Sequence, residues 1–471
     1  MPSPPPIPDP TLLGQVRRVL FEAEFTETRI RALLGACDPG TPADDLLPQW
    51  LWRCRGGDPL AVLVRLFMLG TRVGYREVSR ALAPMTVEQW EHLGLLRHDR
   101  TRVFANVELT AKPGFVIAYD PEFASSRPTR YHVLSVTQSA LTVNRCTIRR
   151  EALRSLDLGA GNGFLALHMS AHSDSVTAVD LNPRALAFAR FNAVLNDVLN
   201  VEFRESDRYS AVAGESFDLI AGNLPFVISP ASELLYRDGE GGSRGFLRSV
   251  LRDAPAHLNE GGFAQFLGQW TGGDAPEIPG CDVCILRFTS DSADEHAARW
   301  LLPGAIQGRG TRARLYREWM KFYEQEHIDV IHTGLWTLRR RSGTGHWRVM
   351  LDRPMPVVTW GDRLEESFRS WGCWQALCGG PERLAQRVRL SPFTVLRTES
   401  QWEPWRAESL LLSSDGFGVP TPVREAALRW IPLADGTRTL CEIAAELQLA
   451  DVEAWLEEVA KLLLHGHLEL A

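Results

Sequence analysis

The sequence predicts an α/β fold with a parallel sheet at its centre and helical units before and after that sheet. Two observations in the middle of the chain support the sheet. The apolar run at 153–156 leads directly into Asp-Leu-Gly-Ala-Gly-Asn-Gly at 157–163. A β-branched run at 175–180 follows about 20 residues later and ends in a carboxylate, Asp180. A strand, a glycine-rich turn that opens a helix, and a second strand are typical of a βαβ unit.

The glycines of the first motif predict a turn that binds a cofactor. Glycine lets the backbone turn tightly and approach a ligand, and the following helix points its N-terminal amides at that ligand. A dinucleotide needs Gly-x-Gly-x-x-Gly to admit its pyrophosphate, but here Gly163 comes one residue early. Asp157, two residues before Gly159, is a poor neighbour for phosphate and a good one for a cationic sulfonium and amino group. The spacing therefore favours S-adenosylmethionine.

A second motif, Asn-Leu-Pro-Phe at 223–226, predicts a hydrogen-bonding clamp for an amide or amine. The side-chain oxygen of Asn223 and the backbone carbonyl of Leu224 are acceptors that can be held toward substrate N–H groups. Phe226 can stack on or wall in a planar group. With the cofactor turn, this clamp points to methyl transfer, and the candidate catalytic residues are Asn223, Leu224, Pro225 and Phe226.

The order of these motifs resembles that of class I S-adenosylmethionine-dependent methyltransferases. The resemblance covers about Leu156 to Trp270. It is specifically to the branch that includes the HemK-type glutamine methyltransferases of release factors and the methyltransferase small domain enzymes. That branch has Asp-x-Gly-x-Gly-x-Gly, an acid closing strand 2, an Asp after strand 3 and Asn-Pro-Pro-Tyr/Phe after strand 4. This chain has 157–163, Asp180, Ser206-Asp207 and 223–226. The resemblance implies a Rossmann-like sheet, S-adenosyl-L-methionine as cofactor, and N-methylation of an amide or amine, with a protein glutamine as first choice.

The chain departs from the pattern at Leu224, where the branch has proline. Leucine keeps the carbonyl but loses the fixed φ of proline, so loop rigidity and substrate choice stay open. One alternative acceptor is the exocyclic amino group of an RNA or DNA base that is flipped out of its stack. Another is a small natural product. A cofactor-binding scaffold without catalysis, its activity ended by Leu224, is the alternative from a different class.

Several candidate residues also have purely structural interpretations. Asp180 can cap the helix that begins near Pro183, Asp207 can be a surface acid, and Asn223 can be a turn residue. Upstream, the resemblance makes 137–139 a candidate lid over the cofactor, which a plain connector explains equally well. The candidate cofactor-binding residues are Asp157, Gly159, Ala160, Gly161, Gly163, Asp180, Leu181, Asp207, Asn223 and Thr137.

Composition and charge narrow the remaining function classes. The 471 residues, 45% of them apolar and 23% charged, suit a globular protein of more than one domain. With a net charge of -7, the protein has no overall positive potential that would attract nucleic acid, so a protein or small-molecule acceptor is favoured. No apolar run of about 18 residues and no secretory leader are visible, which predicts a cytoplasmic protein without a membrane span. Cys281 and Cys284 lack a matching second pair, so we expect buried thiols and no metal.

The chain divides into five predicted segments. We expect a disordered N-terminus at 1–10, a helical winged-helix-like cap at 11–125, and a methyltransferase domain at 126–355. A linker or extension at 356–425 and a C-terminal helical winged-helix-like domain at 426–471 complete the chain. In the cap, three helices and a two-stranded ribbon made from 102–109 and 114–119 suggest a protein or substrate docking unit more than a DNA reader.

Two features of the predicted methyltransferase domain lie outside the minimal fold. A glycine-rich segment at 236–245 predicts a mobile loop beside the active site, although a solvated connection explains it equally well. A helical insertion near 290–327 carries an aromatic cluster that either roofs the substrate pocket or packs in the core, namely Trp300, Trp319, Phe322 and Tyr323.

Overall fold

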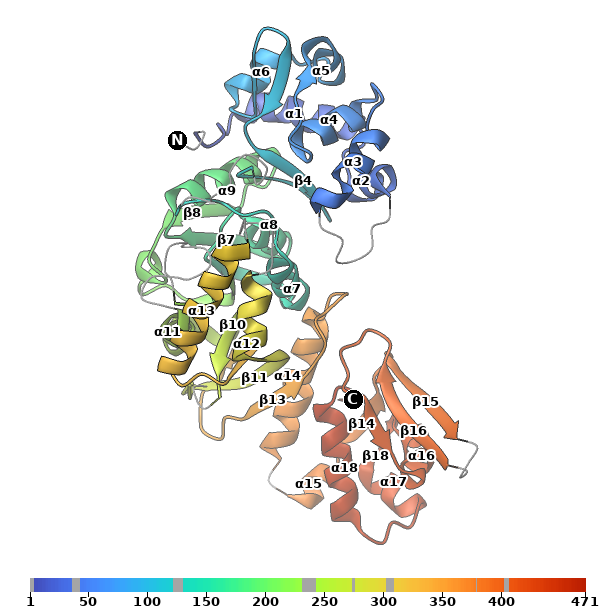
Figure 1. Ribbon diagram of the computed structural model, residues 1–471. Helices are drawn as coiled ribbons and strands as arrows, with labels where there is room; N and C mark the ends of the chain where they lie inside the picture. The colour runs from blue at the N-terminus through green and yellow to red at the C-terminus, as the bar shows by residue number, and fades with distance from the viewer. Residues whose placement is uncertain are drawn as a thin grey trace.

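The computed structural model describes residues 4–35, 43–121, 130–230, 243–272, 276–301, 309–377, 379–401 and 406–471. Along these ranges the chain forms three parts in sequence order (Figure 1): an N-terminal part in blue, a central α/β part in teal to yellow, and a C-terminal part in orange and red. Among the described helices, none combines the length and the apolar character that crossing a lipid bilayer requires.

The N-terminal part combines short helices with two small antiparallel sheets. The predicted strand at 102–109 is divided at Asn106, whose backbone N–H and side-chain amide donate to the carbonyls of Leu95 and Leu96. The first half pairs in a sheet of order β1-β3-β2, and the second half pairs with β5. The elements are α1 (Pro10–Glu22), α2 (Glu27–Leu34), α3 (Ala43–Arg53), α4 (Pro59–Phe67), β1 (Val73–Gly74), α5 (Tyr75–Ala81), α6 (Val87–His92), β2 (Leu96–His98), β3 (Arg102–Ala105), β4 (Glu108–Lys112) and β5 (Phe115–Tyr119).

The start of the chain differs from its predicted disorder within the described residues. Ile7 donates its backbone N–H to the Leu93 carbonyl at 2.9 Å, and Pro6 is buried. Contact with Leu93 and Gly94, just after α6, therefore holds a proline-rich segment whose composition alone suggests a free tail. The winged-helix-like interpretation of this part stays a prediction.

The central sheet has eight strands in the order β13-β11-β12-β10-β9-β6-β7-β8. The five strands from β10 to β8 are parallel, as the sequence predicts, while β12 runs antiparallel to both of its neighbours. The strands are β6 (Ala152–Leu158), β7 (Ser173–Asp180), β8 (Val201–Glu205), β9 (Phe217–Asn223), β10 (Leu258–Thr271), β11 (Cys281–Ser292), β12 (Val330–Arg340) and β13 (Arg348–Asp352). Because the chain leaves β6 toward β7 and later returns to β9 on the other side of β6, a crevice forms at the carboxyl ends of these strands.

Helices cover this sheet, and two of them form the predicted insertion (Figure 1). They are α7 (Gln138–Cys146), α8 (Phe164–Met169), α9 (Pro183–Leu195), α11 (Ser243–Asp253), α12 (Ala293–Leu301) and α13 (Arg309–Gln325), with short 3-10 turns at Ser170–His172, Ser210–Val212 and Ala254–His257. Cys281 and Cys284 on β11 are buried free thiols. Within the described ranges, no group of three or more potential metal ligands comes together.

Helix α9 joins the N-terminal part to the sheet. The side chain of Asn192 accepts the Ala118 N–H at 2.8 Å and donates to the Ala118 carbonyl at 2.9 Å, as a neighbouring strand would. Asn196 repeats this pattern with Val116 one turn further along α9. Asn192 also donates to the carbonyl of Asn162 in the glycine turn. One helix therefore ties strand β5 to the loop that precedes α8.

The C-terminal part begins earlier than its predicted boundary at 426. Strand β14 lies in the 356–425 segment but pairs with both β18 and β19, so the predicted linker or extension is folded into the same unit. Its elements are α14 (Gly361–Ala376), α15 (Gly380–Leu384), β14 (Arg387–Leu390), β15 (Thr394–Gln401), β16 (Arg406–Ser413), β17 (Thr421–Val423), α16 (Glu425–Trp430), a 3-10 turn (Ile431–Leu433), β18 (Asp435–Thr439), α17 (Leu440–Glu446), α18 (Val452–Leu464) and β19 (Leu468–Leu470). Its winged-helix-like interpretation also stays a prediction.

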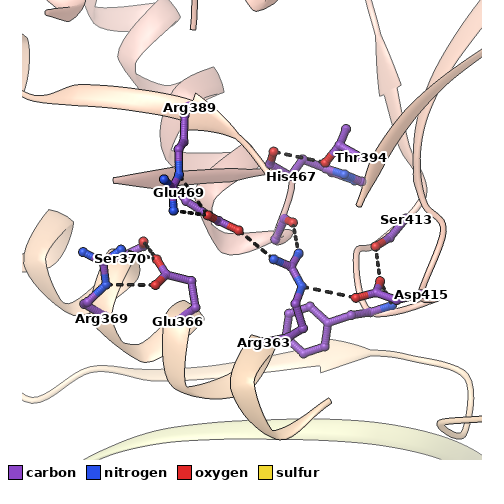
Figure 2. Close-up of polar contacts among 12 residues, drawn as sticks. Arg363, Glu366, Arg369, Ser370, Arg389, Thr394, Ser413, Asp415, His467 and Glu469 are labelled. Carbon is purple, nitrogen blue, oxygen red and sulfur yellow. Dashed lines mark hydrogen bonds and ion pairs between the residues drawn. The ribbon is translucent and has the colours of Figure 1, made fainter. Parts of the chain in front are cut away.

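A buried arginine fastens helix α14 to the C-terminal sheets. Figure 2 shows Arg363 between two carboxylates, donating to Glu469 at 2.7 Å and to the Gly466 carbonyl at 2.8 Å and lying 3.3 Å from Asp415. The residue before α14, Trp360, donates its backbone N–H to the Arg145 carbonyl of α7 at 2.6 Å. Helix α14 is thus bonded to helix α7 of the central part at one end and to the C-terminal part along its length.

Candidate active site

A cavity of about 570 Å³ opens at the carboxyl ends of β6, β7, β8 and β9. The loop after each strand contributes to its lining, in the position that the topology predicts for a ligand. The sequence-predicted residues among this lining are Gly159, Ala160, Gly161, Asp180, Leu181, Asp207, Asn223, Leu224, Pro225 and Thr137. Asp157, Gly163 and Phe226 are near the cavity in sequence but are not part of its lining.

The glycine turn has the backbone conformation that its composition predicts. Gly159, Gly161 and Gly163 have φ values of +80°, +56° and +85°, a region that other residues enter at a cost. A Cβ on Gly163 would lie 3.0 Å from the Cβ of Ala189 on α9. The third glycine therefore permits close packing of the turn against a helix, while the first two face the cavity.

Asp180 secures this turn from the end of β7. Its Oδ2 accepts the Gly161 N–H at 2.8 Å and its Oδ1 accepts the Asn182 N–H at 2.8 Å. Burial raises the pKa of this carboxyl, although the backbone hydrogen bonds oppose the shift. The cap of α9 is Asn182, which accepts the Arg184 N–H, so the alternative capping role for Asp180 belongs to the residue two positions later. Each Asp180 oxygen keeps a lone pair beside the cavity.

Asp157 lies beneath the turn and is fully buried. Its Oδ2 accepts the Ala166 N–H of α8 at 2.9 Å, and its Oδ1 has no hydrogen-bond partner among the described residues. Loss of solvation, with a smaller contribution from the charge of Asp180, raises the pKa of Asp157 to about 7. The sequence predicts direct contact with the cofactor, whereas the structure places this acid behind the loop that faces the cavity.

Asn223 ends strand β9 and lines the cavity. Its Oδ1 is buried and has no hydrogen-bond partner in the described part of the chain. A Cβ on Gly222 would lie 2.7 Å from the Leu158 carbonyl oxygen, so glycine allows β9 and β6 to approach just before Asn223. An orphaned buried oxygen is costly unless a ligand satisfies it, which marks this position as a binding group.

The rest of the second motif has unequal access to the cavity. The Leu224 side chain lies against the glycine turn, with one methyl carbon 3.8 Å from where a Cβ on Gly159 would sit. Phe226 is buried and contacts Trp300 of α12 edge to face, with 6.0 Å between the ring centroids. Of the two interpretations of the aromatic insertion, packing holds, since Trp319 and Tyr323 are buried in the core and neither they nor Trp300 or Phe322 line the cavity.

The segment before α7 crosses the cavity and is held by two asparagines that sequence reasoning did not select. Asn162 in the glycine turn donates to the Leu134 carbonyl at 2.9 Å, and Asn182 donates to the Tyr131 carbonyl at 3.1 Å. Thr137 lines the cavity and also caps α7 by accepting the Ala140 N–H at 3.2 Å. The Asn-Pro pair at 182–183 is a helix-start signal that could have directed attention to this loop.

Charged side chains complete the opposite wall. Asp207 is half-exposed and pairs with Arg208 at 3.1 Å, and Arg208 also donates to Ser249 of α11 at 3.0 Å. Most of the predicted mobile loop at 236–245 falls within 231–242, outside the described residues, but Gly245 contributes to the lining.

These features fit S-adenosylmethionine. The left-handed glycines give a ligand close access to the backbone, Asp180 offers acceptors for ribose hydroxyls, and Asp157 supplies a buried negative group behind the turn when ionised. Asn223 presents its free acceptor in the same cavity.

Comparison with known proteins agrees with this geometry. The methyltransferase small domain family matches residues 138–269. Residues 22–106 match a domain of unknown function, DUF7059. A crystal structure of a methyltransferase from Pyrococcus furiosus also overlaps, at 16% identity over 49% of this chain and 90% of that chain, but the TM-score of 0.29 is too low to carry an argument.

Curated relatives match the same region. A ribosomal protein uL3 glutamine methyltransferase of Xanthomonas campestris is 36% identical over 24% of this chain and 41% of its own length. Release factor glutamine methyltransferases of Xylella fastidiosa and Salmonella typhimurium are 32% and 29% identical, over 30% and 36% of this chain and 54% and 61% of their own lengths. The chain thus spans about half the length of the curated relatives it matches. Its central region, residues 138–269, belongs to the methyltransferase small domain branch of the class I S-adenosylmethionine-dependent methyltransferases.

Proposed function

We propose that this protein transfers a methyl group from S-adenosylmethionine to the side-chain amide nitrogen of a glutamine in another protein. The observation that carries the proposal is the buried, unpartnered Oδ1 of Asn223 in the cavity beside the glycine turn. A primary amide has two N–H groups, so it needs two acceptors, and the Leu224 carbonyl provides the second. The curated relatives named above are glutamine methyltransferases, and their names support the same acceptor.

The proposed mechanism is positional. When bound, the cofactor would supply a sulfonium methyl that is open to in-line attack by the amide nitrogen. The carbon–sulfur bond would break, S-adenosylhomocysteine would leave as a neutral thioether, and the methylated nitrogen would release one proton to solvent. Asn223 and Leu224 accept the two amide N–H groups and so orient the nitrogen toward that methyl, and positioning of this kind can contribute about 7–11 kcal/mol. Burial of Leu224 against the glycine turn keeps water from this side of the cavity. The carboxylate of Asp180 is engaged by two backbone amides and serves binding, not proton transfer.

The acceptor class follows from a labelling experiment. The full chain is incubated with methyl-tritiated S-adenosylmethionine and cell extract, which is then separated into protein, nucleic acid and small molecules. We expect label in protein, and mass spectrometry should find N5-methylglutamine. Purified ribosomal protein uL3 and release factor are the first defined acceptors to test, because relatives are named for them.

A matched pair of asparagine variants links the label to the site. Asn223→Ala should lower transfer at least about 100-fold, because the amide is no longer oriented, while calorimetry shows unchanged cofactor affinity. Asn144→Ala, half-buried on α7 outside the cavity, should change neither. Label confined to nucleic acid or small molecules, or transfer that survives Asn223→Ala, would contradict the proposal.

A further inference from the structure

A buried polar network connects the helical insertion to the residues that follow the Asn-Leu-Pro-Phe motif at 223–226. His296 of α12 and Tyr323 of α13 are 0% and 1% exposed, and their Nδ1 and hydroxyl lie 2.7 Å apart. On its other side, His296 Nε2 lies 3.0 Å from Oε1 of Gln269 on β10. The network therefore joins three elements that are far apart in sequence.

All of its ends meet at Ile228, two residues after Phe226. The Ile228 N–H donates to Gln269 Oε1 at 3.0 Å, and the Tyr323 hydroxyl donates to the Ile228 carbonyl at 2.9 Å. Gln269 is fixed in this orientation because its Nε2 donates to Thr333 on β12 at 3.1 Å. Both backbone polar groups of one loop residue are thus held by side chains from the sheet and the insertion.

Proton positions in the network follow from its donors and acceptors. Burial, with a smaller effect of Arg299, lowers the pKa of His296 to about 3, so the ring is neutral near pH 7. Gln269 Oε1 is an acceptor only, so the ring proton resides on Nε2 and Nδ1 is an acceptor. The single Tyr323 proton then has two acceptors within reach, His296 Nδ1 and the Ile228 carbonyl.

The insertion holds the same segment through apolar contacts. Trp319 of α13 stacks on the His296 ring, with centroids 6.0 Å apart, and Trp300 of α12 packs against Phe226. The loop from Asn223 to Ile228 is therefore held by contacts at the Phe226 side chain and by hydrogen bonds at the Ile228 backbone. At its other end, Asn223 is the last residue of β9.

We propose that His296, Tyr323 and Gln269 are positioning residues that hold the 223–228 loop in the geometry needed for methyl transfer. This inference rests on the proposed function. A leucine at 224 leaves φ free where a proline would fix it, so ordering this loop for the reaction costs backbone conformational entropy. Hydrogen bonds at both polar groups of Ile228 supply from outside the loop the rigidity that its own sequence lacks.

The test compares two tyrosines of one helix. Tyr323→Phe removes only the hydroxyl of the network, and Tyr316→Phe makes the same change on α13 at a half-buried position outside it. Hydrogen exchange followed by mass spectrometry on the full chain should show about tenfold faster exchange of the peptide covering 223–229 in Tyr323→Phe and no change in Tyr316→Phe. His296→Phe, which keeps a ring against Trp319 and removes both nitrogens, should accelerate exchange less than Tyr323→Phe, because the Tyr323 hydroxyl keeps its bond to the Ile228 carbonyl.

Transfer kinetics separate positioning from general stability. In Tyr323→Phe we expect kcat for the methylated acceptor protein to fall about tenfold, with KM for S-adenosylmethionine unchanged. Unchanged exchange at 223–229, or faster exchange with an unchanged kcat, would overturn the inference. Failure of the proposed function has a different signature, since the wild-type chain would then label no protein glutamine whatever the exchange data show.

Discussion

The carboxylate of Asp180 accepts the backbone N–H of Gly161 at 2.8 Å, so the end of strand β7 fixes the conformation of the turn after strand β6. The two strands are neighbours in the sheet, with Leu158 paired to Val179. A left-handed glycine is flexible when unrestrained, and this bond restrains it before any ligand arrives. Asp180 therefore organises the glycine turn in addition to lining the cavity.

Removing this carboxylate should weaken cofactor binding. In Asp180→Ala, Gly161 loses its partner and the cavity loses its hydroxyl acceptor, so we expect the Kd for S-adenosylmethionine to rise at least about tenfold, as measured by calorimetry. Asp174→Ala changes an exposed acid at the other end of the same strand and should leave the Kd unchanged. Equal affinities in the two variants would contradict this role.

Asp157 should make the unliganded protein less stable as pH rises. Its folded pKa of about 7 lies above the ordinary value of 3.8, so between these values the folded chain binds more protons than the unfolded chain. This group's contribution to the free energy of unfolding is therefore full below 3.8 and falls as pH rises toward about 7. Asp157→Asn keeps an acceptor for Ala166 and removes the titration. Its Tm relative to wild type should rise between about pH 5 and about pH 8, and a constant difference would show that Asp157 does not titrate there.

The glycines of the turn should differ in their response to alanine. Gly161→Ala and Gly163→Ala both place a side chain at positive φ, at about 1–2 kcal/mol each. Only the Cβ at 163 meets a neighbour, Ala189 at 3.0 Å, so overpacking should add about 1 kcal/mol or more there. Urea unfolding measures the difference, with Gly214→Ala, at φ +78° in open space, as control. Equal losses at 161 and 163 would mean that α9 moves away without cost.

The buried ion pairs of Arg363 should dominate the attachment of the C-terminal part. Arg363→Met leaves Glu469 and Asp415 without this partner, and breaking a buried pair typically costs about 3–5 kcal/mol. Arg397→Met breaks an exposed pair with Glu399 and should cost about 0.5 kcal/mol or less. Chemical unfolding of the full chain, followed by a probe in the C-terminal part, measures the loss in free energy of unfolding for each variant. Similar losses in Arg363→Met and Arg397→Met would argue against a dominant role for the buried Arg363 ion pairs.

Local sequence patterns predicted the elements that line the cavity wherever a few consecutive residues determine the local structure. The glycine turn, the acid that closes β7 and the 223–226 motif are each formed by a few consecutive residues after a strand. Parallel topology then brings the ends of those strands to one edge of the sheet. Thr137, Asp180 and Asn223 therefore meet at one cavity although 86 positions separate the first from the last in the numbering, 223 less 137.

Packing determined the features that the sequence did not predict. Asp157 is buried because α8 begins directly over it, and Phe226 turns to Trp300 because the insertion provides an aromatic partner. The asparagines at 162 and 182 donate to carbonyls 28 and 51 positions upstream, which no local pattern reveals. Strand β14 has one buried residue, Val388, too weak a signal to place it between β18 and β19.

The pairing of β10 limits how this protein can be dissected. The family match ends at residue 269, yet β10 pairs with β12 from Phe263 to Thr271, and Gln265 and Gln269 donate to Thr337 and Thr333 on that strand. A fragment cut at 269 would expose an apolar strand edge, a template for aggregation, and leave two glutamine amides without these partners. An autonomous catalytic fragment must therefore extend through β13 at Asp352, and the family boundary in sequence is not a boundary in folding.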